Sequence, residues 1–91
     1  MVESSIEAGM RRKVLKRGGL FYKFVSPGND GVPDRILVHQ GRVVFVEMKQ
    51  PSGKLSRMQK FQIERLQRNG ADVRVVYNSE QADALIEEVM G

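Results

Sequence analysis

Cysteine is absent from the 91 residues, so neither a disulfide framework nor a thiolate metal site can hold the fold together. No apolar run approaches the roughly 20 residues that a membrane-spanning helix needs. The first ten residues, MVESSIEAGM, lack the basic start and apolar stretch of a secretory signal. These absences argue against a membrane or secreted protein and predict one small domain, residues 1–91, in the cytoplasm.

Acidic residues are outnumbered by basic ones. Fifteen Lys and Arg residues against eleven Asp and Glu residues give a formal net charge of +4. Such an excess fits a nucleic-acid partner, but many basic proteins bind none, so charge alone leaves the partner open. A domain this small is only marginally stable by itself, and a dimer interface or a bound metal would supply additional stability.

The hydrophobic pattern predicts an α/β fold in the order α-β-β-β-α-β-α. Helices are expected over residues 4–17, 56–69 and from Asn78 or Ser79 onward, and strands over residues 20–25, 34–39, 42–49 and 72–77. A capping box of Ser4 with Glu7 is expected to start the first helix. The β-α-β unit near the end predicts a right-handed crossover between parallel strands, and therefore a mixed sheet flanked by helices.

The hairpin between the second and third strands brings charged residues together. If the turn is centred on Gln40 and Gly41, continued pairing along both strands places Asp34 opposite Glu47. Directly opposed side chains have Cβ atoms about 4.5–5.5 Å apart. Lys49 lies on the same face as Glu47, because side chains alternate along a strand.

Two opposed carboxylates destabilise a sheet unless something offsets their repulsion. A hard divalent cation is the natural candidate, because Mg²⁺ prefers oxygen ligands and often takes only one or two carboxylates. The backbone carbonyl of Met48 would be a further ligand. The alternative is a solvated polar face in which Lys49 pairs with one of the carboxylates.

Three short motifs in this order resemble the VRR-NUC nucleases of the PD-(D/E)XK superfamily. They are GVPD at residues 31–34, EMK at residues 47–49 and GKLSRMQ at residues 53–59, and the resemblance extends over residues 7–77. A proline-aspartate pair followed by E-x-K is weak by itself, but the three motifs in this strand context are more specific.

The resemblance implies a restriction-endonuclease-like core and a phosphodiesterase that binds Mg²⁺ or Mn²⁺ at Asp34 and Glu47. It implies that Lys49 assists catalysis. Short stand-alone members are similar to Holliday junction resolvases, are typical of phages acting in the host cytoplasm, and are expected to be homodimers. Larger relatives carry the same domain in flap nucleases, so the motif does not fix the geometry of the DNA substrate.

Two further residues are candidates for the same site. Glu7 matches the helix acid that completes the metal site in junction-resolving relatives, although the capping box explains it without a metal. Gln59 falls with Met58, Ile63 and Leu66 on the inner arc of its helix. From there its amide would hold a water or a phosphate, whereas the alternative is a boundary residue that reaches solvent.

Four residues around the site are candidate DNA contacts. Ser26 and Asn29 belong to the loop that borders Asp34, and Lys54 and Arg57 flank the connector after Lys49. An apolar fourth strand and an amphipathic last helix are candidates for a dimer surface.

Three functions are compatible with this pattern. The first is a Mg²⁺-dependent, structure-specific DNA endonuclease that acts on branched DNA such as Holliday junctions. The second is a flap or nicking nuclease of recombination or repair. The third is a nucleic-acid-binding protein that keeps the fold without the activity, and the intact Asp34, Glu47 and Lys49 argue against it.

Overall fold

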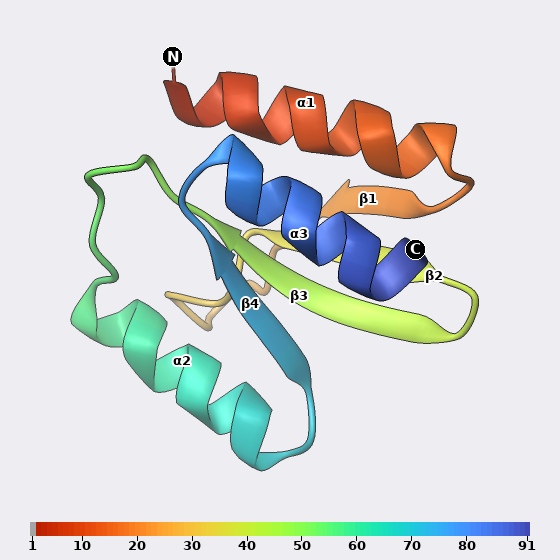
Figure 1. Ribbon diagram of the computed structural model, residues 1–91. Coiled ribbons are helices and arrows are strands. Elements are labelled where there is room, and N and C mark those ends of the chain that lie inside the picture. Colours follow the sequence, from red (N-terminus) through yellow and green to blue (C-terminus); the bar gives the residue numbers. More distant parts are fainter. Residues whose placement is uncertain (1) are drawn as a thin grey trace.

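The computed structural model describes the backbone of residues 2–91 and the side chains of residues 5–91. Its seven elements follow the predicted order (Figure 1). They are α1 (Val2–Lys16), β1 (Leu20–Lys23), β2 (Arg35–His39), β3 (Arg42–Met48), α2 (Arg57–Arg68), β4 (Asp72–Val76) and α3 (Ser79–Met90). No helix in this described part combines the length and apolar composition needed to cross a bilayer.

The strands form one mixed sheet in the order β1-β2-β3-β4. β1 and β3 each pair antiparallel with β2, and β4 runs parallel to β3, which confirms the predicted parallel pairing of the β-α-β unit. His39 faces Arg42 and Arg35 faces Val46, so the predicted hairpin register is confirmed. Gln40 and Gly41 both have positive φ, 45° and 85°. Such two-residue turns match the right-handed twist of the strands that they join.

Helices cover both faces of the sheet. α1 and α3 lie side by side over one face, and the core between them and the sheet includes Met10, Val44, Val46, Met48 and Ile86 (Figure 1). α2 packs against β4 on the other face of the sheet, where Gln59 of α2 donates a hydrogen bond to Glu47 of β3. Because alternate residues of β3 enter the α1–α3 core, Glu47 is directed to the α2 face.

The helix starts differ in part from the sequence-based expectation. α1 begins at Val2, so Ser4 lies inside the first turn and the predicted capping position is wrong. The Ser4 side chain lies outside the described residues. Ser56 caps α2 as predicted, and of the two candidates for α3 the cap is Asn78, whose side chain accepts a hydrogen bond from the Gln81 backbone.

The surface predicted for a dimer lies inside the protein. Leu85, Ile86 and Val89 of α3 are buried, and so are Val73 and Val76 of β4. Periodicity identified these residues as apolar but could not say what covers them, and the covering partners are α1, α2 and the sheet itself.

Three of the exposed large apolar side chains lie on β1 and β3 instead. Leu20, Tyr22 and Val43 are 42%, 57% and 47% exposed. The register Leu20 with Val38 and Val38 with Val43 places them on the face of the sheet that also carries Glu47. α2 therefore leaves the β1–β3 part of this face open.

Candidate active site

Asp34 is fixed by backbone contacts at the point where β2 begins. Its carboxylate Oδ1 accepts a hydrogen bond from the Met48 backbone N–H at 3.0 Å, and its carbonyl accepts one from the Phe24 N–H at 2.9 Å. Since Met48 directly follows Glu47, the first bond joins Asp34 to the strand of the second carboxylate. The structure thus brings Asp34 and Glu47 together, as the register predicted.

Glu47 is a buried carboxylate, with only 4% of the residue exposed. Gln59 Nε2 donates a hydrogen bond to its Oε2 at 3.1 Å, and Lys49 Nζ lies 3.9 Å from the same oxygen. A buried charge is costly unless it is paired and hydrogen-bonded. The amide and the ammonium group provide this compensation, and they hold the carboxylate in one orientation.

Gln59 joins the start of α2 to the site. Its backbone N–H and side-chain Oε1 complete a capping box with Ser56, at 3.1 and 2.8 Å, while its Nε2 holds Glu47. One side chain therefore both starts the helix and contacts the buried acid. Its predicted direction toward the site is confirmed, and its catalytic role remains a prediction.

The residues on the buried face of α2 are not all those that the sequence predicted. Met58 is 46% exposed, whereas Gln62 is only 8% exposed beside Ile63. Sequence reasoning missed Gln62 because a polar residue is ordinarily assigned to the solvent side of an amphipathic helix.

The loop before Asp34 packs closely on α2. A Cβ added at Gly31 would lie 2.6 Å from the backbone carbonyl atoms of Met58 and 2.9 Å from the Gln59 nitrogen, and the φ of Gly31 is 90°. Only glycine allows this combination of contact and conformation without strain. The loop thereby fixes the position of Gln59 relative to Asp34.

Glu7 reaches Asp34 through Arg35. Arg35 Nε lies 3.3 Å from Glu7 Oε2, and the Arg35 guanidinium donates to the Asp34 carbonyl at 2.9 Å and lies 3.5 Å from Asp34 Oδ2. Arg35 was not among the predicted site residues, although its position directly after the GVPD motif was the available signal. Within residues 5–91, no group of three or more His, Cys, Asp or Glu side chains is arranged to hold a metal ion.

The donor set nevertheless suits a hard divalent cation. Asp34 and Glu47 supply carboxylate oxygens, and Mg²⁺ often takes only one or two carboxylates and fills its remaining positions with water and phosphate. The ligand assignment to Glu7, Asp34, Glu47 and the Met48 carbonyl remains a prediction.

Residues 13–80 match the family of the VRR-NUC domain. The chain belongs to the VRR-NUC domain family. The matched range contains Asp34, Glu47, Lys49 and Gln59, whereas Glu7 precedes it.

Two similar proteins agree with this assignment. A solved structure described as a VRR_NUC domain superposes with a TM-score of 0.87 at 31% identity, and the match covers 96% of each chain. "Putative nuclease p44" of Acyrthosiphon pisum secondary endosymbiont phage 1 is 51% identical over 53 residues, which is 57% of each chain. The VRR-NUC chain therefore spans little more than half the length of this curated relative.

The predicted DNA contacts of the VRR-NUC domain border the site. Asn29 Nδ2 donates to Ser26 Oγ at 2.9 Å within the loop that precedes Asp34. Lys54 and Arg57 are exposed near the start of α2, and neither forms an ion pair with a described residue. Their contact with DNA remains a prediction.

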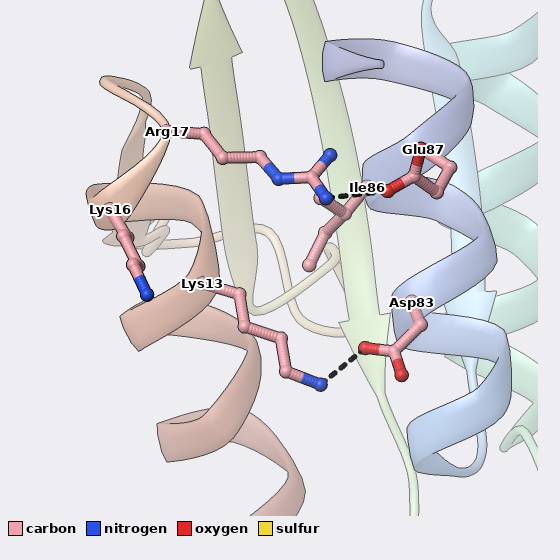
Figure 2. Close-up of a pocket in the computed structure, with 6 residues that line it drawn as sticks. All are labelled: Lys13, Lys16, Arg17, Asp83, Ile86 and Glu87. Carbon is pink, nitrogen blue, oxygen red and sulfur yellow. Dashed lines mark hydrogen bonds and ion pairs between the residues drawn. The ribbon is translucent and has the colours of Figure 1, made fainter.

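A cleft of about 610 Å³ lies elsewhere, between α1 and α3. Figure 2 shows Lys13 of α1 and Arg17, which directly follows α1, directed toward Asp83 and Glu87 of α3, with which they form ion pairs. None of the predicted site residues of the VRR-NUC domain lines this cleft. Two of the three cations that line it, Lys13 and Arg17, are thus already paired with carboxylates.

The groups with shifted pKa values, Arg74 and Glu88, also lie away from the site. Arg74 of β4 donates hydrogen bonds to Glu88 of α3 and to Asp72. The Arg74 guanidinium lowers the pKa of Glu88, and the two acids, Glu88 most strongly, raise the pKa of Arg74. This exposed network joins β4 to α3 and has no place in the chemistry.

Proposed function

We propose that this VRR-NUC domain is a Mg²⁺- or Mn²⁺-dependent, structure-specific endodeoxyribonuclease that hydrolyses phosphodiester bonds in branched DNA such as Holliday junctions. The observation that carries the proposal is the buried Glu47 carboxylate, held by Gln59 and Lys49 directly beside Asp34. The formal net charge of +4 suits a polyanionic substrate. Because one relative comes from a phage, the host cytoplasm is the proposed place of action.

The residues have separate parts in this proposal. Asp34, Glu47 and the Met48 carbonyl would hold the cation, with Glu7 as a further ligand if it leaves Arg35. The bound cation would supply a Lewis acid that stabilises negative charge on the phosphate. Lys49 Nζ lies 3.9 Å from Glu47 Oε2, and its ammonium group would stabilise the negative charge that develops in the transition state. Gln59 keeps the Glu47 carboxylate in its orientation.

Two alternatives share the fold. A flap or nicking nuclease would use the same residues on another DNA geometry. A non-catalytic DNA-binding protein would need the basic surface but no buried carboxylate beside a lysine. The compensated burial of Glu47 therefore favours an enzyme, because it maintains a charge that binding alone does not require.

A substrate panel with Mg²⁺ tests the proposal. The substrates are a four-way junction, a flap, a splayed arm, a nicked duplex and a supercoiled plasmid. We expect cleavage of the four-way junction to be fastest, and Lys49→Ala to lower that rate at least about a hundredfold, because it removes a preorganised charge.

Lys60→Ala is the matched control, since Lys60 is exposed on α2 and forms no ion pair with a described residue. Faster cleavage of flap or nicked DNA would favour the second function. Equal cleavage by wild type and Lys49→Ala would show that the active site does not include Lys49 and would overturn the proposed assignment.

We further propose that the active form is a homodimer in which a second copy covers Leu20, Tyr22 and Val43. These side chains are exposed on neighbouring strands and lie on the face of the sheet that carries the site. Light scattering should give twice the monomer mass of 10.3 kDa, and Tyr22→Lys should shift it to the monomer. A wild-type monomer at micromolar concentration would overturn the proposed homodimer.

A further inference from the structure

A second cleft lies beside the site, between the loop after β1 and the inner face of α2. Its volume is about 320 Å³, and its lining includes Phe24, Asn29, Gln62, Arg65, Leu66 and Asn69. The Phe24 N–H donates to the carbonyl of Asp34, and the Phe24 ring contacts Phe45, two residues before Glu47 on the same strand face. Phe24 thus links this cleft to the two segments that carry Asp34 and Glu47.

The lining of this cleft contains no carboxylate. The other four clefts described here each include at least one acidic residue, namely Asp83 and Glu87, Glu7, Asp83, and Glu88. Arg65 is the charged residue in the lining of this cleft. The Arg65 guanidinium lies 5.5 Å from the centre of the Phe61 ring. A positive rim without an acid favours an anionic ligand such as a DNA strand.

Gln62 presents a polar group to this cleft. The residue is only 8% exposed, and its side chain makes no hydrogen bond with any residue that the structure describes. No fully buried side-chain nitrogen or oxygen in the described part lacks a partner, so the amide opens to the cleft that Gln62 lines. A partly buried amide that has no protein partner is available to hydrogen-bond a ligand that enters the cleft.

We propose that this cleft binds an unpaired nucleobase of the DNA strand next to the cleaved phosphate, an inference that rests on the proposed nuclease function. The Gln62 amide would donate to and accept from the edge of the base. Asn29 and Asn69 use their amide nitrogens in local hydrogen bonds at 2.9 Å and keep carbonyl oxygens as acceptors. Phe24 and Leu66 provide apolar contact.

The occupant is unpaired for a steric reason. A base that is stacked and paired in a duplex cannot enter a side cleft, whereas a base at a branch point or bulge is already free of its partner. Pockets of about 300 Å³ and more, with apolar walls and a few polar groups, are typical of small-molecule sites. The cleft would therefore select branched DNA over continuous duplex.

Fluorescence anisotropy in EDTA tests this inference without cleavage. Two labelled duplexes are compared, one with a single bulged adenosine and one with an abasic residue at the same bulge. Wild type should bind the adenosine bulge at least about threefold more tightly, because the base adds a hydrogen bond with Gln62 and apolar contact with Phe24 and Leu66. Gln62→Met, which keeps the apolar volume, should reduce this preference by the share of the hydrogen bond, and Gln67→Met on the exposed side of α2 should leave it unchanged.

The outcomes separate the two proposals. Equal affinity of wild type for the two bulges, or full preference in folded Gln62→Met, would overturn the base site. The wild-type comparison needs no variant and decides the matter even if Gln62→Met does not fold. A clear base preference in a protein that cleaves no DNA would overturn the nuclease function alone.

Discussion

Replacing Glu47 with glutamine should abolish tight binding of Mn²⁺ and lower DNA cleavage at least about a hundredfold. The substitution keeps the size of the side chain and a hydrogen-bonding oxygen for Gln59. It removes the negative charge from a group that is only 4% exposed and 3.9 Å from Lys49. The cation would lose one of its two principal anionic ligands, and Lys49 would lose its partner.

Electron paramagnetic resonance of a Mn²⁺ titration measures this effect directly. Glu64→Gln is the matched control, because Glu64 lies exposed on α2 and, among the described residues, pairs only with Arg68 at 3.8 Å, one turn along the helix. We expect the control to bind Mn²⁺ like wild type. If folded Glu47→Gln binds Mn²⁺ with wild-type affinity, Glu47 is not a ligand.

Gly31→Ala should lower the free energy of unfolding by about 2–4 kcal/mol, from backbone strain and overpacking together. The added methyl carbon would lie 2.6 Å from the Met58 carbonyl group at a backbone φ of 90°. Neither the loop nor the first turn of α2 can accept it in place. We also expect slower cleavage, because a displaced first turn moves Gln59 away from Glu47.

Urea denaturation separates the two causes with Gly28→Ala as the control. Gly28 has nearly the same φ, 83°, but an added Cβ would meet nothing within 4 Å. Gly28→Ala should therefore lower the free energy of unfolding only by the cost of backbone strain, about 1–2 kcal/mol. Equal destabilisation by the two variants would mean that the contact between the loop and α2 contributes nothing.

The parts of the fold that depend on local pattern were predictable. Alternation along residues 42–48 and the turn at Gln40 and Gly41 are local features, and they were sufficient to give the hairpin register and the proximity of Asp34 and Glu47. Ser56 as the cap of α2 followed from the same kind of reasoning.

Apart from the cap of α1, the main errors concern contacts between distant segments. Arg35 lies between Asp34 and Glu7, which are far apart in sequence, and no local pattern indicates that pairing. The buried position of α3 depends on α1, which precedes it by about sixty residues. Gln62 looked like a surface residue because a sequence does not show a cleft formed by a loop more than thirty residues away.

The most direct test of the central claim is the single-turnover cleavage rate of a four-way junction by wild type and by Lys49→Ala, in Mg²⁺ and in EDTA. The assignment of Asp34, Glu47 and Lys49 predicts rapid cleavage only by wild type in Mg²⁺. Cleavage that persists in EDTA, or that is equal in Lys49→Ala, would contradict it.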